Sequence, residues 1–309
     1  NAFGWESQGL NYGTFNIGVP NPYTTIAPGS GTAEFESAGA IDPADNNNGV
    51  VVDNVGDLWL LDVPSGTYTF VGNMGVVDAT GLEFDLSSGI LYMTTLTDLY
   101  IIDPLTPSAT FVGSLGTSGQ AAIALAIDNT STGYTYDITD DTFYTVDLAT
   151  GAATAVGTIG FDASFGQGMF YDDATDQVYL ASLNAGAGNL GELRSADVTT
   201  GATTLIGEWN PGVVSQVAWA SVGNALNLGV EENLLAEVSV YPNPASDVIN
   251  VRVPNGVEIQ NVTVYDLLGK DTGLRIVNGQ IDINELSRGV YMVNIQTTAG
   301  TLTEKVVKK

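Results

Sequence analysis

Short stretches in which apolar and polar residues alternate, or in which every residue is apolar, follow one another along residues 1–225. One set occupies residues 57–62, 67–72, 81–85 and 90–94, and each stretch is bounded by Gly, Asp, Ser or Asn. A period of two, broken by turn-forming residues, is typical of β-strands. The pattern therefore predicts an all-β fold with four short strands in each set.

This set of strands recurs. Each copy has an Asp at the end of its first stretch, and these are Asp62, Asp103, Asp147 and Asp197. A Gly follows ten residues later in each copy, at Gly72, Gly113, Gly157 and Gly207. The third stretch ends with Asp in three copies and with Ala in the fourth, at Asp85, Asp128, Asp172 and Ala220. A more degenerate copy runs through Asn16, Ile26 and Asp42. A spacing of 41 to 50 residues with four strands per copy is typical of β-propeller blades.

The two ends of the repeat complement each other. The last copy lacks its fourth strand, and residues 2–7 form a candidate strand at the N-terminus. If the first three strands of the chain join the last strand of the array, the open sheet edge disappears. We therefore predict a five-bladed β-propeller over residues 1–225, closed by the N-terminal strand. Residues 226–237 lack the repeat and are predicted to be a linker.

The recurring Asp at the end of the first stretch is followed in most copies by a Gly four residues later. An Asp carboxylate can accept a backbone N–H in a hairpin turn, and Gly can adopt a positive φ there. A catalytic residue has no need to recur in every blade. These Asp residues are therefore predicted to form turns.

Charge is distributed unevenly. The formal net charge is −27. One basic residue, Arg194, against 25 acidic residues up to Val230 gives that part −24, whereas seven basic against ten acidic residues give the rest −3. Because the first part has no cluster of cations to neutralise phosphates, we expect no nucleic-acid binding. No apolar run reaches the length of a membrane span, so we expect no transmembrane segment.

The chain has no Cys and no His. Disulfides, thiol chemistry, His-containing triads and His-held zinc are therefore excluded. The sequence begins at Asn1 without a leader, and we expect that a signal peptide has been removed.

The last part of the chain, residues 238–309, has a different strand pattern. Short candidate strands occupy residues 238–241, 248–253, 260–265, 275–277, 280–283, 289–297 and 301–308. Six or seven short strands in such a segment suit a small Ig-like β-sandwich. Pro242 and Pro244 lack N–H donors, so we expect an extended kink there.

An ordered set of motifs runs through this segment: Tyr-Pro-Asn-Pro, Tyr-Asp-x-x-Gly-Lys, Gly-Val-Tyr and a basic C-terminus. Together they resemble the type A C-terminal sorting domain of the type IX secretion system of Gram-negative bacteria. The residues that match the family's motifs are Pro242, Asn243, Pro244, Gly269, Lys270, Gly289, Tyr291, Lys308 and Lys309.

The resemblance implies a route and several partners. Such cargo passes through the periplasm and leaves through an outer-membrane translocon while a shuttle β-barrel holds the sorting domain. A cell-surface sortase often acts on it afterwards. The expected location is extracellular or on the outer cell surface.

Three hypotheses remain for the activity of residues 1–225. A glycoside hydrolase would use paired carboxylates, and the loops leading to the inner strands offer Glu34, Glu36, Asp78, Asp162 and Glu208. A binding or adhesion module for carbohydrate or another surface ligand would use Trp209, Phe161, Asp162 and Asp78. The third hypothesis is a structural surface protein.

Two oxygen-rich loops could hold calcium. Their candidate ligands are Asp42, Asp45, Asp172, Asp173 and Asp176. Turn formation explains the same residues, so calcium is a secondary hypothesis, and no other cofactor is predicted.

Overall fold

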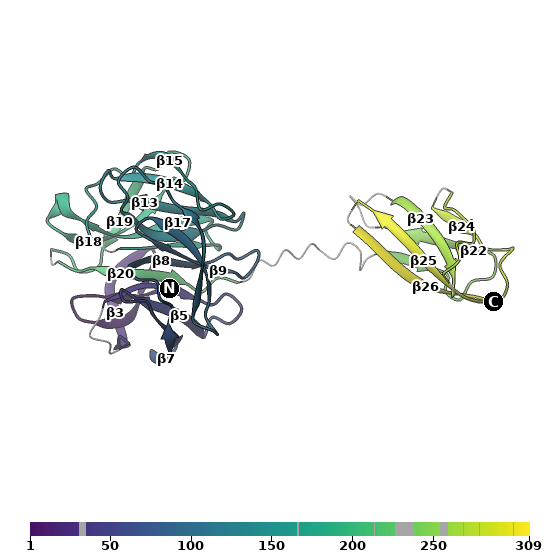
Figure 1. Cartoon of the computed structure of the whole chain (residues 1–309), viewed down its shortest axis with the longest axis horizontal. Coiled ribbons are helices and arrows are strands. Elements are labelled where there is room, and N and C mark those ends of the chain that lie inside the picture. Colours follow the sequence, from purple (N-terminus) through teal and green to yellow (C-terminus); the bar gives the residue numbers. More distant parts are fainter. Residues whose placement is uncertain are drawn as a thin grey trace. The chain divides into compact units, whose positions relative to one another are not determined.

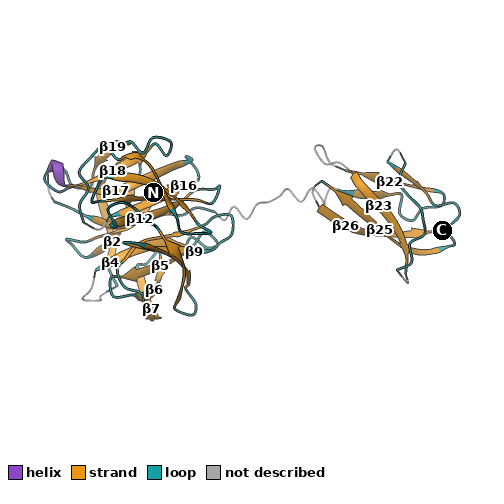
Figure 2. Cartoon of the chain, turned by 45° about the horizontal axis from the view of Figure 1, so that its top comes forward, coloured by secondary structure: helices purple, strands orange, loops and turns teal. Residues whose placement is uncertain are grey.

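The computed structural model consists almost entirely of antiparallel β-sheet (Figures 1 and 2), which confirms the all-β prediction. It describes residues 1–30, 35–165, 167–212, 214–225, 238–253, 259–267, 269–277, 279–298 and 300–309. The predicted linker, residues 226–237, lies outside these ranges. The chain divides into two compact units, Asn1–Leu228 and Gly229–Lys309.

The first unit contains five four-stranded antiparallel sheets. The first comprises β4 (Glu36–Ile41), β5 (Asn48–Asp53), β6 (Asp57–Asp62) and β7 (Thr67–Asn73). The second comprises β8 (Ala79–Phe84), β9 (Leu91–Thr95), β10 (Asp98–Asp103) and β11 (Ser108–Ser114). The third comprises β12 (Ala122–Ile127), β13 (Thr132–Asp137), β14 (Thr142–Asp147) and β15 (Ala153–Thr158). The fourth comprises β16 (Gly168–Asp172), β17 (Gln177–Asn184), β18 (Leu190–Ala196) and β19 (Thr203–Glu208), with the short 3-10 turn η1 (Ala185–Ala187) between β17 and β18. The fifth comprises β20 (Val217–Val222), β1 (Ala2–Glu6), β2 (Asn11–Asn16) and β3 (Val19–Pro28).

The first strands of these sheets form a closed ring of contacts. β4 contacts β8, β8 contacts β12, β12 contacts β16, β16 contacts β20, and β20 contacts β4. Between them lies a void of about 10 Å³, which is roughly the space that a single water molecule requires. The inner strands therefore fill the centre of the ring.

The N-terminal strand completes the fifth sheet, as predicted. β1 lies between β20 and β2 and pairs antiparallel with both. In the ladder with β20, Gly4 is opposite Ala220 and Trp5 is opposite Trp219. Figure 1 shows the purple N-terminal strands and the green β20 in the same unit. This pairing joins the two ends of the unit and covers an edge that β20 would otherwise expose.

The glycine that recurs in the outermost strand of four sheets has a packing role. A Cβ atom at Gly113 would lie 1.9 Å from the carbonyl oxygen of Thr150, and one at Gly157 would lie 2.2 Å from that of Thr200. Thr150 and Thr200 belong to hairpins of the following sheet. Because only glycine lacks a Cβ atom, it allows this close approach between neighbouring sheets.

The recurring hairpin aspartates accept backbone hydrogen bonds, as predicted. Asp62 Oδ1 accepts from the Ser65 amide at 2.9 Å, and Asp197 Oδ1 accepts from the Thr199 amide at 2.9 Å. Asp103 and Asp147 make the equivalent bonds. Hydrogen bonds from the side chain and then the backbone of Thr199 lower the pKa of Asp197 to about 2. The carboxylates thus stabilise the turns in their ionised form.

The second unit contains two three-stranded antiparallel sheets. One comprises β21 (Ser239–Tyr241), β22 (Val248–Arg252) and β24 (Gln280–Asp282). The other comprises β23 (Ile259–Asp266), β25 (Gly289–Thr297) and β26 (Gly300–Lys308). Buried residues from both sheets, including Ile249, Val264 and Ile295, belong to one hydrophobic core.

One predicted strand of this unit is wrong. Residues 275–277 form no strand; only Val277 makes an isolated bridge, to Gln280. The side chains of Leu274 and Ile276 nevertheless pack against the core. The apolar alternation in this segment therefore reflects burial without pairing to a neighbouring strand.

Candidate functional site

The end of β26 is attached to the segment that follows β21. The Ala245 amide donates to the Val307 carbonyl at 2.9 Å, and the Lys309 amide donates to the Ala245 carbonyl at 2.9 Å. The Asn243 side chain adds two bonds: its Oδ1 accepts from the Val307 amide at 2.9 Å, and its Nδ2 donates to the Lys305 carbonyl at 2.6 Å. We call this pair of segments, residues 242–246 and 305–309, the docked terminus.

The other predicted sorting residues lie at the same end of the sheet β23–β25–β26. In the ladders, Gly289 is opposite Lys308, while Tyr291 is opposite both Asp266 and Val306. The Tyr291 hydroxyl donates to the Ser287 carbonyl at 3.0 Å.

The Gly-Lys motif forms the turn that leaves β23. Gly269 has a φ of +80°, which favours glycine, and its amide donates to the Asp266 carbonyl at 3.0 Å. The Lys270 amide donates to Asp266 Oδ1, also at 3.0 Å. Because Asp266 pairs with Tyr291, motifs that are distant in the sequence meet at one end of one sheet.

The four predicted ligand-binding residues of the first unit do not form one site. Trp209 is 1% exposed and packs against Phe15 with ring centroids 4.4 Å apart, so its ring has no face available for stacking. Phe161 packs against Arg194. Asp162 and Asp78 are exposed but lie on connections to different sheets. Asp78 lines a cavity of about 180 Å³ together with Phe35, Asn54 and Ile123.

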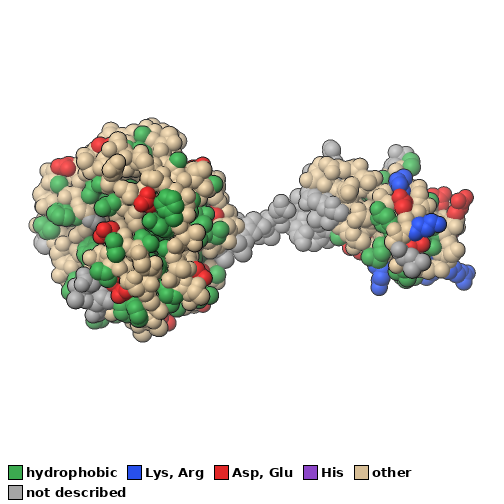
Figure 3. Space-filling model, in the orientation of Figure 1, with side chains coloured by type: hydrophobic (Ala, Val, Ile, Leu, Met, Phe, Trp, Pro, Cys, Tyr) green, Lys and Arg blue, Asp and Glu red, His purple; other side chains and the backbone are tan. Residues whose placement is uncertain are grey.

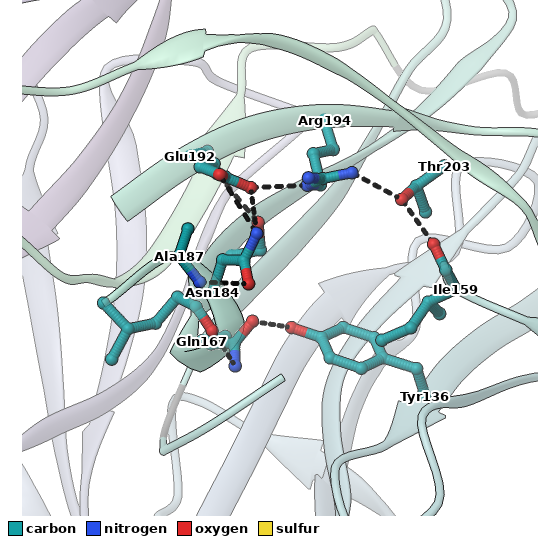
Figure 4. Close-up of polar contacts among 10 residues, drawn as sticks. Tyr136, Ile159, Gln167, Asn184, Ala187, Glu192, Arg194 and Thr203 are labelled. Carbon is teal, nitrogen blue, oxygen red and sulfur yellow. Dashed lines mark hydrogen bonds and ion pairs between the residues drawn. The ribbon is translucent and has the colours of Figure 1, made fainter. Parts of the chain in front are cut away.

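Arg194, the single cation of the first part of the chain, lies in a buried polar network (Figure 4). Its Nε lies 2.6 Å from Glu192 Oε2, and its Nη1 donates to Thr203 Oγ1 at 3.2 Å. Its guanidinium carbon lies 4.5 Å from the ring centroid of Phe161. Glu192 also accepts two bonds from Asn184 Nδ2. Both charges thus have partners inside the protein, and Arg194 has a structural role in this network.

Two of the carboxylates considered for hydrolysis accept hydrogen bonds within the protein. Glu36 is buried and accepts from the Ser30 amide, the Tyr68 hydroxyl and Trp219 Nε1. Glu208 accepts from the Gly212 amide at 3.0 Å. Glu34 lies outside the described residues. The central void is lined without any carboxylate.

Three of the five aspartates considered for calcium are used as turn acceptors. Asp42 and Asp45 accept from the amides of residues 44 and 47, and Asp172 accepts from residues 174 and 175. Asp176 accepts the Tyr171 hydroxyl at 2.8 Å. Among the described residues, no three acidic side chains come close enough together to hold a metal ion.

The second unit matches a known family. Residues 239–309 match the family described as secretion system C-terminal sorting domain. The chain therefore carries a sorting domain of the type IX secretion system, which implies export outside the cell. Within the residues that the structure covers, no helix has the length and apolar character needed to cross a membrane.

A curated relative and two solved structures resemble the chain to different extents. Beta-agarase D of Zobellia galactanivorans is 32% identical over 74 residues, which are 23% of this chain and 15% of that protein. A protein of unknown function from Bacteroides caccae is 8% identical, covers 71% of this chain and 97% of its own, and gives a TM-score of 0.48. PorZ, a surface component of the type IX secretion system of Porphyromonas gingivalis, is 15% identical, covers 97% of this chain and 50% of its own, and gives a TM-score of 0.33.

Proposed function

We propose that this chain is a type IX cargo in which residues 1–225 form a five-bladed β-propeller and residues 238–309 form an Ig-like export domain. Five four-stranded sheets with their first strands in a closed ring support the propeller. Two three-stranded sheets around one core support the sandwich. The cargo passes through the periplasm and acts outside the cell or on its outer surface.

The observation that carries the proposal is the meeting of the sorting motifs at one end of the sheet β23–β25–β26. A partner can contact all of them at once only if they share a surface. We propose that the outer-membrane shuttle β-barrel and the translocon recognise this end. A cell-surface sortase then acts on the exported protein.

Deleting residues 304–309 should trap the protein in the periplasm. The deletion removes the last part of β26, with the bonds from Asn243 and Ala245 and all three terminal lysines. Cell fractionation and immunoblotting of periplasm, outer surface and medium would measure the distribution. Normal secretion of the truncated protein would contradict the proposal.

A matched control removes cations elsewhere in the same unit. Arg252→Ala together with Arg275→Ala eliminates two charges that lie outside the docked terminus, and this variant should be exported normally. Tryptophan fluorescence checks that the first unit is folded, because all four tryptophans lie in residues 1–225.

We further propose that the propeller binds or adheres to a surface ligand and does not hydrolyse sugars. The filled centre of the ring supports this, because hydrolysis requires two carboxyl groups facing each other across an open site. The excess of acidic residues favours neutral or cationic ligands. On the face shown in Figure 3, Lys and Arg are visible on the second unit only.

A glycan array probed with the full chain tests this role. We expect binding to a defined set of neutral or amino-sugar glycans and none to sulfated ones. Absence of binding to every glycan would favour the third hypothesis, a structural surface protein.

A further inference from the structure

Hydrogen bonds hold the docked terminus along its length. Here the Asn243 amide group bonds to the backbone on both sides of Val306, which is 2% exposed. The Lys309 amide is itself bonded to Ala245. The buried side chain of Val306 and the hydrogen bonds on either side of it therefore fix residues 305–309.

This arrangement separates the three terminal lysines by role. The Lys308 ammonium donates to the Ser246 carbonyl, so this lysine serves the attachment. Lys305 and Lys309 are exposed, and no ion pair involves them among the described residues. Because side chains alternate along a strand, Lys305 and Lys309 project on the same side, away from buried Val306.

We propose that Asn243 is a positioning residue of the export signal. It holds β26 so that the ammonium groups of Lys305 and Lys309 form a folded surface for a partner in the secretion machinery that bears carboxylates. The partner thus reads a preformed surface instead of a flexible tail. This inference rests on the proposed export function and adds the residue that organises its recognition surface.

Backbone entropy supports the proposal, because ordering a free segment on binding reduces its conformational freedom and weakens binding. When folding has already ordered the strand, a partner does not meet that cost at the moment of binding. The hydrogen bond from Asn243 Nδ2 to the Lys305 carbonyl requires an amide side chain at position 243, because a carboxylate has no N–H to donate.

Asn243→Asp tests the role with the same side-chain shape. It keeps an acceptor for the Val307 amide and places an oxygen against the Lys305 carbonyl. Exchange of the Lys309 amide with solvent should accelerate about tenfold in the purified full-length protein, equivalent to a loss of about 1.4 kcal/mol. Export should fall by about the same factor.

Asn250→Asp is the matched control. Asn250 Nδ2 also donates to a backbone carbonyl, that of Tyr241, at 3.1 Å, but it lies outside the docked terminus. In this variant, exchange of the Lys309 amide and export should both match the original protein. If it behaved like Asn243→Asp, the special role of Asn243 would be refuted.

A second variant tests recognition without loosening the strand. Lys305→Glu with Lys309→Glu should keep amide exchange of Val307 unchanged and block export. Normal export of this variant would overturn the role of the cationic surface. Normal export of Asn243→Asp, together with accelerated exchange of the Lys309 amide, would overturn the need for a preformed surface. Either result leaves the proposed export function standing, since the truncation decides that separately.

Discussion

Replacing Arg194 with methionine should lower the free energy of unfolding of the first unit by about 3–5 kcal/mol. The substitution keeps an apolar stem of similar length but leaves the Glu192 carboxylate, which is 3% exposed, without its cation. Removing one partner of a buried ion pair is costly because the other charge stays away from water. The bond to Thr203 and the contact with Phe161 are lost as well.

Urea unfolding followed by tryptophan fluorescence measures this effect in the first unit alone. Arg275→Met is a control, because Arg275 pairs with Asp271 at 2.8 Å on the surface of the second unit. It should leave the tryptophan transition unchanged. The double variant Arg194→Met with Glu192→Gln should recover much of the stability, because it removes the unpaired charge. A single variant as stable as the original protein would show that the pair is not structurally important.

Several features of the fold were accessible from sequence because they repeat. The hairpin aspartates and the outer-strand glycines recur with each copy, and each performs a local task, a turn or a close approach. The missing strand in the last copy revealed that the N-terminus completes the fifth sheet. Each of these residues alone is a weak signal, but because they recur once per copy, the number of copies indicates the number of sheets.

The candidate binding residues of the first unit were harder to predict because burial depends on neighbours that are distant in the chain. Trp209 follows an outer strand and resembles a loop residue in sequence, yet Phe15 from β2 covers it. Similarly, Phe161 is covered by Arg194 from β18. No periodic pattern indicates which strand of another sheet will lie over a loop.

The sorting motifs were recognised from sequence, but their joint geometry was not. Asp266 and Ser287 accept hydrogen bonds from Lys270 and Tyr291. Ala245 bonds the same end of β26 that Asn243 does. Asp266 gives a signal, since an Asp followed three residues later by Gly predicts a turn. The parallel pairing of Ala245 with β26 gives none, because one bridge leaves no alternation in the sequence.

Glu83 carries the second large effect that we expect. It lies in the inner strand β8, is 5% exposed, and accepts from the Phe84 amide at 3.2 Å. Burial raises the pKa of Glu83 to about 8, although backbone hydrogen bonds from Phe84 and Tyr171 favour the ionised form. Tyr171 belongs to β16, which lies two positions further around the ring from β8.

A raised carboxyl pKa makes the folded state lose stability as pH rises. Below the unfolded pKa of about 4.5, both states hold the proton and Glu83 costs nothing. Between that value and about 8, the unfolded chain releases the proton while the folded chain keeps it. Each pH unit in this window costs about 1.4 kcal/mol. Above the folded pKa the loss is complete, at about 5 kcal/mol.

Glu83→Gln should therefore stabilise the first unit by about 3 kcal/mol at pH 7 and by more at pH 8.5, with no gain at pH 4. Urea unfolding by tryptophan fluorescence across this range measures the difference between the two proteins, in which the contributions of the other acidic residues cancel. Glu208→Gln, a less buried substitution of the same kind, should leave the pH profile unchanged. A constant difference between Glu83→Gln and the original protein at every pH would mean that the pKa of Glu83 is the same in the folded and unfolded states. The polar contacts of Glu83 would then have to offset the effect of its burial.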